Sequence, residues 1–569
     1  MKIHLCDPIG PYSTSAPENV ELYRLVAFLK HNGYSVSFDD LKIKILSRFF
    51  DENLIDSFVT NEDDKLYKIN RESIFSSFYE YLLNIARLKA PQLFKKINAN
   101  KPDGTLSEAN KIINGEIKKW VKKIILDDID LVGFSFVAGK VLEATEKKEE
   151  PQEYLLPFIW AIILAQAIKK RKQIPIFVGD NAPRIGAYSY VKGTFESQEA
   201  VDFIIFEDFE KTLLDYLKRI ENGGNTLTVP GTITKTKGGK IICNSSRGLV
   251  KNLDRLPYPD YSGIRWDLYK KVFGSKQIYI YGSIGCSERC TFCNEWSYRN
   301  EYISRSPEHV VGEIMNLKQK YDVNFITFKD RLINVDIHRL EKICNLLISN
   351  KINVPWFAYA KVTPHMTKKL LTKMHRGGCK QISWSIESGS PKIIKKMGKK
   401  FSLKEASRVL KDATLCEIEN IVPILTDFPG EGEKEFNETI KFIEKNLAYI
   451  KHIRINRFRA DLSKEVYLNP EKYGLVFRDG NFYPKLKNRG WGKNWGSHMP
   501  KFVEAVRRLN EKNNIGLMTK NLLDKNFEAG YIIEVLKTKF GLDRKEAFKY
   551  VIKAKEEYKP FGVMNKNEK

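Results

Sequence analysis

Two hydrophobic spacings alternate along the first 221 residues. Short apolar runs typical of buried strands are separated by stretches in which apolar residues recur every three or four positions, the helical spacing. Strand-like runs lie at 2–5, 35–38, 131–136, 174–179 and 203–206, with helix-like runs at 20–32, 154–170, 187–191 and 211–221. The pattern from about 48 to 125 is helical throughout and predicts a helical insertion. This alternation predicts an α/β fold in which residues 1–221 form a doubly wound, Rossmann-like parallel sheet.

The same alternation returns in the second half of the chain. Residues 222–265 are punctuated by Gly and Pro and predict a linker with a hairpin at 232–243. Residues 266–460 then repeat strand and helix six times. Strands are expected near 276–283, 323–328, 354–360, 380–386, 419–426 and 451–456, with helices near 306–320, 336–349, 366–376, 403–415 and 433–446. Chemistry in such parallel domains lies at the carboxyl ends of the strands.

Residues 461–569 have a different pattern, which predicts a small, mostly helical C-terminal domain. Its clearest helices are expected at 501–514 and 543–558. The run NRGWGKNWGSH at 488–498 is rich in Gly and aromatic residues, and we interpret it as a loop that faces substrate. The region contains no cysteine, which excludes a domain that holds an auxiliary iron–sulfur cluster.

Composition and charge predict the cellular compartment of the protein and the character of its surface. The 569 residues suffice for three or four domains, and the apolar run at 154–168 is shorter than a membrane span needs, so we expect a buried helix and no membrane partner. No signal peptide opens the sequence, and eight unevenly spaced cysteines make no disulfide framework, which predicts a cytoplasmic protein. The net charge of +25 suits nucleic acid, an acidic peptide or solubility. Because the lysines are spread along helix-like segments without an arginine-rich arm, we expect a solvated basic surface and no nucleic-acid partner.

The strongest chemical signal is the run GCSERCTFC at 285–293, directly after the strand-like run 277–281. It holds three of the eight cysteines, spaced C-x3-C-x2-C. Thiolates select zinc or iron–sulfur centres. A structural zinc normally takes four ligands, and no fourth Cys or His lies nearby. An iron–sulfur cube with one open iron fits three thiolates, and a zinc knuckle is the alternative.

This loop resembles that of the radical S-adenosylmethionine (radical SAM) enzymes, whose motif is C-x3-C-x-aromatic-C. In that family the three cysteines hold a [4Fe-4S] cluster, and the fourth iron chelates the amino and carboxylate groups of SAM. Reductive cleavage of SAM yields a 5′-deoxyadenosyl radical. The resemblance implies that Cys286, Cys290 and Cys293 ligate the cluster, that Phe292 lines the adenine site, and that residues 266–460 form a partial (β/α)6 barrel.

Further family motifs flank the loop. The run LDRLPYPDY at 253–261 matches the L-D-x-L-P-x-P-D-Y segment that leads into the family's core. Asp330 stands where the family often has an acid for the SAM amino group, with helix capping as its alternative role. Lys361 stands where related enzymes often have Arg. A lysine can neutralise the SAM carboxylate without a two-pronged donor set, and an ordinary surface lysine is the alternative.

The fourth and fifth core strands carry two more motifs. The run GCKQISWSIESGS at 378–390 is close to the family's G-C-x-x-I-x-x-G-I-E-S-G-S, which implies SAM contacts for Glu387 and Ser388. The turn TDFPGEGE at 426–433 resembles G-x-P-G-E-T-x-E, which implies that Pro429 and Gly430 approach the adenine. Cys379 occupies a place where the family commonly has Cys, and we interpret it as a packing residue.

Residues 1–221 resemble the cobalamin-binding domain that precedes many radical SAM cores. VGFS at 132–135 matches the family's V-G-x-S, and VGDN at 178–181 lies where it has V-G-G, which implies cobalamin contacts for Ser135 and Asn181. Both glycines of the family's G-E-G-E are replaced, by Glu207 and Phe209, and the D-x-H-x-x-G loop is absent. Glycine lets backbone approach a bulky ligand, so these replacements could close the pocket for the nucleotide tail. Cobalamin binding and a scaffold sheet without a corrin both remain open.

The sequence thus predicts a radical SAM enzyme, with cobalamin-dependent C-methylation of a peptide or natural-product intermediate as the favoured reaction. The expected partners are that peptide or small-molecule substrate and an electron donor such as flavodoxin or ferredoxin. One alternative is a cobalamin-independent peptide epimerase or rearrangement enzyme, in which Cys416 or Cys379 returns a hydrogen atom. An alternative from another class is a non-catalytic zinc or nucleic-acid-binding protein.

Overall fold

The computed structural model of the chain describes most of its first 484 residues. The described residues are 1–9, 19–51, 104–136, 156–180, 198–273 without 207, 237 and 249, 276–293, 301–458, 464–478 and 481–484, with 82, 85, 86, 89, 195, 536, 542, 546, 547, 549 and 550. They divide into two compact units. The first unit comprises Met1–Lys361, Lys369–Ile382 and Arg459–Lys485, and the second comprises Val362–Lys368, Ser383–Phe458 and Leu486–Lys569.

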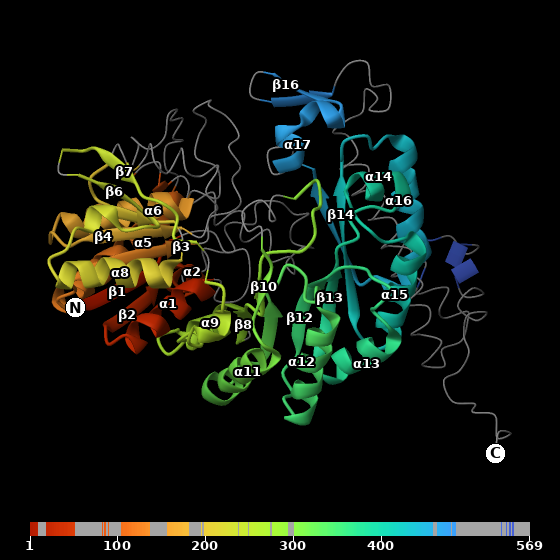
Figure 1. The fold of residues 1–569 in the computed structure, drawn as a ribbon, viewed down its shortest axis with the longest axis horizontal. Coiled ribbons are helices and arrows are strands. Elements are labelled where there is room, and N and C mark those ends of the chain that lie inside the picture. Colours follow the sequence, from red (N-terminus) through yellow and green to blue (C-terminus); the bar gives the residue numbers. More distant parts are fainter. Residues whose placement is uncertain are drawn as a thin grey trace. The chain divides into compact units, whose positions relative to one another are not determined.

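The strands between Lys2 and Cys243 in the first unit form a seven-stranded sheet, here called the front sheet. Its strand order is β2-β1-β3-β4-β5-β6-β7 (Figure 1). Its five parallel strands confirm the predicted Rossmann-like fold: β1 (Lys2–Asp7), β2 (Ser35–Asp40), β3 (Leu131–Phe136), β4 (Ile176–Asp180) and β5 (Phe203–Ile205). The expected hairpin exists as β6 (Thr232–Lys235) and β7 (Ile241–Cys243). It is part of the sheet rather than of a free linker, because β6 pairs antiparallel with β5.

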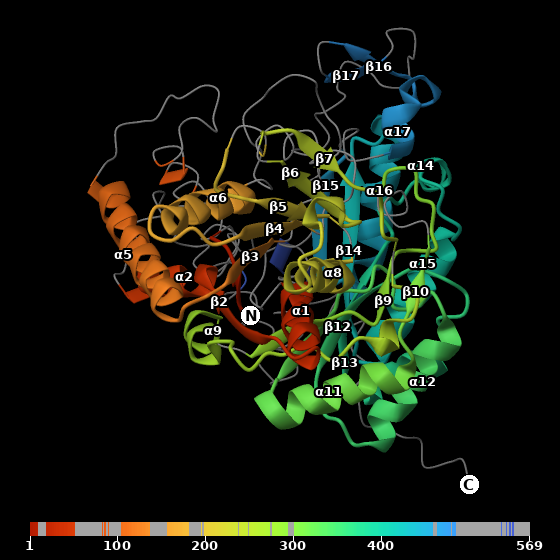
Figure 2. The ribbon, with the colours of Figure 1, turned by 60° about the vertical axis from the view of Figure 1, so that its left-hand side comes forward.

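Helices of this sheet follow the predicted pattern, and α1 lies beside α8 while α5 lies beside α2 and α6 (Figure 2). Their bounds are α1 (Val20–His31), α2 (Leu41–Asp51), α5 (Gly104–Leu126), α6 (Leu156–Lys169) and α8 (Phe209–Glu221). Helix α6 is buried on nearly every side, which explains its uninterrupted apolar run without a membrane. Among the described residues, no helix is both long and apolar enough to cross a bilayer. The helix expected at 187–191 lies outside the described residues.

The core sheet has the order β15-β14-β13-β12-β11-β8, which is simply the chain order reversed. Its strands are β8 (Gln277–Ile280), β11 (Phe325–Phe328), β12 (Trp356–Ala360), β13 (Cys379–Trp384), β14 (Glu419–Thr426) and β15 (His452–Arg457). The helices that alternate with them are α11 (Pro307–Tyr321), α12 (Ile337–Ser349), α13 (Lys368–Arg376), α15 (Leu403–Leu415) and α16 (Glu433–Asn446). The pairs β8–β11 and β11–β12 in the first unit and β14–β15 in the second are parallel. These bounds confirm the six predicted repeats, and the short α14 (Pro391–Lys396) is an addition.

The L-D-x-L-P-x-P-D-Y segment joins the two sheets of the first unit. Its Tyr261 is fully buried, with its ring 5.0 Å from that of Tyr23 on α1, and its hydroxyl donates to the carbonyl of Tyr279 on β8 at 3.4 Å. The carboxylate of Asp260 pairs with Lys30 at 2.8 Å. The motif is therefore a packing device that fixes the first core strand to α1. It leads to α9 (Trp266–Phe273), which precedes β8.

After the core, the described residues form α17 (Lys464–Leu468), the 3-10 turn η8 (Pro470–Tyr473) and an antiparallel pair, β16 (Leu475–Arg478) with β17 (Asn481–Pro484). The sequence pattern predicted mostly helix here. The missed signal is Asp479-Gly480, since an Asp-Gly pair between apolar runs is typical of a two-residue hairpin. The predicted loop 488–498 and helix 501–514 lie outside the described residues, as does most of 543–558.

Candidate functional site

The cysteine loop leaves the carboxyl end of β8, the first core strand, where the sequence predicted it. Cys286, Cys290 and Cys293 are all partly exposed, and the amide of Cys293 donates to the carbonyl of Cys290 at 3.1 Å. Gly285 has φ +81°, and a Cβ there would lie 2.1 Å from the carbonyl oxygen of Glu301. Only glycine fits this close approach, so the backbone is fixed just before the first thiol.

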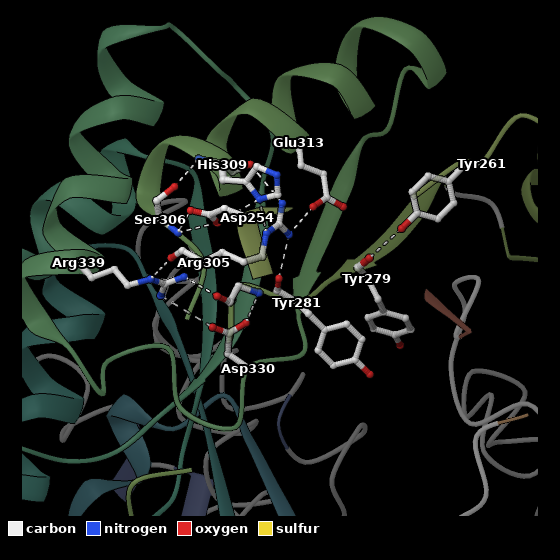
Figure 3. A network of polar contacts seen from close by, with 11 residues as sticks. Asp254, Tyr261, Tyr279, Tyr281, Arg305, Ser306, His309, Glu313, Asp330 and Arg339 are labelled. Atoms are coloured by element: carbon white, nitrogen blue, oxygen red, sulfur yellow. Dashed lines mark hydrogen bonds and ion pairs between the residues drawn. The ribbon is translucent and has the colours of Figure 1, made fainter. Parts of the chain in front are cut away.

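A buried carboxylate holds the base of the loop (Figure 3). Asp330, which follows β11 closely and is fully buried, accepts hydrogen bonds from the backbone N–H of Gly282 and from the Ser283 hydroxyl, both at 2.7 Å. The Arg339 guanidinium donates to the carbonyl of Gly282 at 2.7 Å and lies 4.0 Å from the Asp330 carboxylate. A Cβ on Gly282 would lie 2.9 Å from that carboxylate. Both backbone groups of Gly282 are thus held, the N–H by Asp330 and the carbonyl by Arg339.

Arg305 extends this network toward helix α11. Its guanidinium donates to the carbonyl of Tyr281 at 2.9 Å and pairs with the buried carboxylate of Glu313. Arg339 in turn donates to the backbone carbonyl of Arg305 at 2.8 Å. Because buried charges are stable only when they are paired and hydrogen-bonded, this chain of contacts makes the strand end rigid.

The geometry gives Asp330 a different role from the predicted contact with the SAM amino group. Its two oxygens are directed at the loop base, and burial raises its pKa, against the opposing influence of Arg339 and the hydrogen bonds. It does not cap a helix either, since Asp336 accepts from the amide of Arg339 at the start of α12. Asp330 is a positioning residue beneath the cysteine loop.

Lys361 follows β12 and reaches into the cysteine loop. Its backbone is held by the amide side chain of Asn334, which accepts from its N–H at 3.0 Å and donates to its carbonyl at 2.8 Å. Its ammonium group donates to the carboxylate of Glu288 at 2.7 Å, with the Lys361 and Glu288 side chains 29% and 23% exposed. The sequence analysis named Lys361 but not this partner. A lysine fixed at a strand end and holding a carboxylate has the chemistry of a carboxylate site.

Two further contacts complete the loop's surroundings. The ammonium nitrogen of Lys329, the residue before Asp330, lies 3.9 Å from the ring centre of Tyr279, a cation–π contact. Phe292 is partly buried, and its neighbour Thr291 shares a hydrogen bond with Tyr473 of η8. Burial is the main cause that raises the pKa of Tyr473. The segment after the core therefore contacts the cysteine loop, a relationship that no local sequence pattern signals.

In the second unit, Glu387 has the features of a ligand-binding carboxylate. It follows β13 in the left-handed region with φ +67°, and its backbone is held by hydrogen bonds to Pro423 and from Leu425 at 3.0 and 2.8 Å. Burial raises the pKa of its carboxyl group, and Lys399 opposes that shift. A strained backbone and a perturbed acid at the carboxyl end of a strand are typical of functional sites.

The Ser388 side chain makes its contacts within the protein, with Thr439 and Ser390. Its hydroxyl is fully buried 3.2 Å from that of Thr439 on α16 and accepts from the amide of Ser390 at 3.1 Å. A Cβ on Gly389 would lie 2.5 Å from Cβ of Phe442 on α16. The Ser-Gly-Ser part of the motif therefore packs this turn against α16, and the predicted SAM contact of Ser388 stays a prediction.

The turn after β14 also requires its glycine. Pro429 and Gly430 are buried, Gly430 has φ +89°, and a Cβ there would lie 2.2 Å from the ammonium nitrogen of Lys396. The carboxylate of Glu431 accepts from the amide of Asp427 at 2.6 Å. The turn is tightly fixed, as a backbone that approaches an adenine would need to be.

Residues 280–443 match the sequence profile of the Radical SAM superfamily. They form a radical SAM domain. The chain is 25% identical over 253 residues to an uncharacterised methyltransferase of Pyrococcus horikoshii, an alignment that covers 44% of this chain and 54% of the relative. The chain thus spans about half the length of this curated relative.

Two solved structures share the fold at low identity. One is the radical SAM methyltransferase TsrM from Kitasatospora setae with cobalamin and a [4Fe-4S] cluster bound, at 14% identity and TM-score 0.55, covering 84% of this chain and 76% of that one. The other is the cobalamin-dependent radical SAM enzyme OxsB with aqua-cobalamin and SAM bound, at 15% identity and TM-score 0.54, covering 98% and 71%. The likeness confirms a Rossmann-like domain followed by a radical SAM domain.

A radical SAM domain uses a [4Fe-4S] cluster and SAM, and the three partly exposed thiols of the loop are the donor set that such a cluster takes. Within the described part of the chain, no three His, Cys, Asp or Glu side chains converge on one point as a single metal ion would require. A four-iron cluster does not need that convergence, because each thiolate binds a different iron.

The front sheet was expected to offer cobalamin contacts at Ser135 and Asn181. Its order β2-β1-β3-β4-β5 is the flavodoxin-like order, in which ligands bind at the ends of β1 and β3. Ser135 lies there, but its hydroxyl donates to the side-chain oxygen of Asn19 at 3.3 Å, and its carbonyl accepts from that side chain at 2.6 Å. This pairing ties β3 to the start of α1. Asn181 lies outside the described residues.

Phe209 fills the space that the family's glycine would leave. Its ring packs on Gly179 at the end of β4, so closely that a Cβ on Gly179 would lie 2.2 Å from the ring, and the side chain is 5% exposed. The next residue, Glu210, is buried in an ion pair with Arg24 of α1. Phe209 thus occupies the space beside Gly179 that a glycine at position 209 would leave open.

The two thiols considered as hydrogen donors lie at the wrong ends of their strands. Cys379 is the first residue of β13, and Cys416 ends α15 just before β14. Strand β13 has six residues, so its carboxyl end is roughly 17 Å from Cys379. Both side chains are buried, and burial raises the pKa of the Cys379 thiol. Both thiols therefore lie away from the carboxyl ends of the strands, and the burial of Cys379 suits a packing role.

Proposed function

We propose that the chain is a radical SAM enzyme that abstracts a hydrogen atom from an unactivated carbon of a peptide or natural-product intermediate. The observation that carries the proposal is the cysteine loop at the carboxyl end of β8, into which Lys361, the residue after β12, reaches to bind the Glu288 carboxylate at 2.7 Å. When bound, the [4Fe-4S] cluster supplies the electron that cleaves SAM to the 5′-deoxyadenosyl radical.

The chain's own residues bind and orient these groups. Cys286, Cys290 and Cys293 hold the cluster, while Asp330 keeps the strand end beneath them fixed. Lys361 is the candidate for the SAM carboxylate. In the second unit, Glu387 is the candidate for the ribose hydroxyls or the SAM ammonium, and the turn with Pro429 and Gly430 is the candidate for the adenine.

We propose cobalamin-dependent C-methylation as the reaction that follows hydrogen abstraction, in which the substrate radical would take up a methyl group from bound methylcobalamin. It is supported by the methyltransferase relative of Pyrococcus horikoshii and by the fold shared with TsrM and OxsB. The net charge of +25 suits an acidic peptide as the substrate and an acidic flavodoxin or ferredoxin as the electron donor.

The packing of Phe209 on Gly179 favours a second candidate, a cobalamin-independent epimerase or rearrangement enzyme. In this candidate the front sheet is a scaffold, and the hydrogen atom returns from a source other than Cys379 or Cys416. A corrin spectrum after reconstitution with hydroxocobalamin separates the two candidates: retained corrin with methylated product supports the first, and no retained corrin would exclude it.

Anaerobic reconstitution with iron and sulfide tests the common part of both candidates. We expect about four irons per chain, the brown iron–sulfur absorption, and formation of 5′-deoxyadenosine from SAM with dithionite. The Cys290→Ala variant should lose deoxyadenosine formation, whereas the Cys243→Ala variant, which changes an exposed cysteine outside the loop, should keep it. About one zinc per chain without the chromophore would instead support the non-catalytic zinc protein.

A further inference from the structure

We propose that Glu288 occupies Lys361 as a stand-in for the SAM carboxylate, and that SAM binds by displacing it. The inference rests on the proposed function and names a residue of the cysteine loop that tunes the affinity for SAM. It is carried by the contact between the Lys361 ammonium and the Glu288 carboxylate at 2.7 Å.

Lys361 is built as a receptor rather than as a surface lysine. Both backbone groups of Lys361 are bound by the fully buried amide side chain of Asn334, at 3.0 and 2.8 Å. The stem of the side chain therefore starts from a fixed point at the carboxyl end of β12. Its ammonium group offers three donors to whichever carboxylate is near.

Glu288 lies between Cys286 and Cys290, so it brings its carboxylate to Lys361 from within the loop itself. Chemically this group is equivalent to the amino-acid carboxylate of SAM. A second carboxylate beside Glu288 would add negative charge next to three thiolates and would have to share the Lys361 ammonium with Glu288, and like charges at such distances repel. Exchange is therefore favoured over sharing.

Once displaced, the Glu288 side chain can turn toward solvent. Ser287 and Arg289 on either side of Glu288 are exposed, and the Glu288 side chain is itself 23% exposed. Asp330 cannot take the same part, because it is fully buried and bonded to Gly282 and Ser283. Glu288 can thus leave Lys361 for water without burying an unpaired charge.

Direct binding of SAM to the reconstituted protein, without reductant so that no turnover occurs, tests the exchange. Equilibrium dialysis should show that Glu288→Gln binds SAM about two- to fivefold more tightly, because the competing ion pair is of the partly exposed kind. Lys361→Gln should bind SAM roughly tenfold more weakly, since it loses a charge-assisted hydrogen bond. The double variant should match Lys361→Gln, because in the exchange Glu288 affects SAM by competing with it for Lys361.

The matched controls change the same residue types in the ion pair between Lys342 and Glu308, which is 2.6 Å long, exposed and outside the loop. Glu308→Gln and Lys342→Gln should leave SAM affinity unchanged. Iron content is measured for every variant. If Glu288→Gln binds SAM equally or more weakly, or loses iron together with Lys361→Gln, the pair is only a tether of the loop and the exchange is overturned. A wild-type protein that holds neither iron nor SAM would overturn the proposed function itself.

Discussion

The carboxylate of Asp330 accepts the backbone N–H of Gly282 at 2.7 Å, and this contact fixes the point from which the cysteine loop departs. The two residues are 48 positions apart and meet because β8 and β11 are neighbouring parallel strands whose carboxyl ends lie at one edge. The acid that the family pattern assigns to SAM thus makes its hydrogen bonds to the base of the cysteine loop. The contact also makes Gly282 obligatory, because a Cβ would clash with the carboxylate.

Replacing Asp330 should therefore affect the cluster through the fold. Asp330→Asn removes the carboxylate that faces the buried Arg339, and we expect a stability loss of about 3 kcal/mol, typical of breaking a buried charge pair. Iron per chain after reconstitution should fall with it. Thermal unfolding and iron analysis measure both. Asp322→Asn changes an exposed ion pair with Lys318 in the same unit and should alter neither quantity, and equal losses in both variants would contradict the role of Asp330.

Acid should weaken the front sheet through His4. This residue is fully buried on β1, bonded to Ser37 at 2.9 Å and to the indole N–H of Trp120 at 3.2 Å, and burial lowers its pKa to about 4 despite the nearby Asp39. The unfolded chain binds a proton at His4 below about pH 6.5, whereas the folded chain binds it only below about 4. The contribution of His4 to the free energy of unfolding is therefore fully present above about pH 6.5. It falls as the pH drops toward 4, by up to about 3 kcal/mol.

Urea unfolding followed by tryptophan fluorescence at pH 7 and pH 5 measures this loss. A His4→Gln variant, which cannot take up the proton, should show a smaller difference between the two pH values. His31→Gln, at the end of α1, is the matched control and should keep the wild-type difference. Identical pH dependence in wild type and His4→Gln would exclude His4 as the cause.

Opening the space at Gly179 should increase corrin retention. Phe209→Ala removes the ring that packs on this glycine. After incubation with hydroxocobalamin and desalting, we expect the variant to retain more corrin absorbance than the wild-type protein. Phe203→Ala removes another buried ring of the same sheet, which stacks on Tyr216, and controls for loosened packing. If the wild-type protein already retains one corrin per chain and Phe209→Ala retains no more, then Phe209 does not close the space beside Gly179 to a corrin.

The buried thiols should be dispensable for the reaction. Cys379→Ala and Cys416→Ala should form 5′-deoxyadenosine and product at wild-type rates, because both residues lie at the amino ends of their strands. Cys379→Ala should cost about 1 kcal/mol of stability through lost packing. Chromatographic analysis of product and of solvent deuterium incorporation checks the rates. Loss of product with intact deoxyadenosine formation would restore a thiol as hydrogen donor.

Local patterns were sufficient for the framework of this protein. The six core strands and their helices follow from hydrophobic periodicity, and the observed bounds lie within three residues of the predicted ones. The cysteine spacing likewise specifies the cluster loop, since three thiolates within eight residues must share one loop whatever surrounds them. The missed elements are short or weakly periodic, such as α14 and the β16–β17 pair, where turn chemistry outweighs hydrophobic pattern.

The roles of single polar residues depended on the tertiary structure. Asp330, Ser388 and Phe209 stand at motif positions, yet their neighbours are Gly282, Thr439 and Gly179, which lie 30 to 51 residues away in sequence. Whether a side chain faces a ligand or the protein depends on which distant group fills the space beside it, and spacing along the chain carries no information on that. The sequence by itself determined the cysteine loop, the parallel strands and the front sheet. Only packing decided that Lys361 holds Glu288, because that ion pair joins residues 73 positions apart across two strand ends.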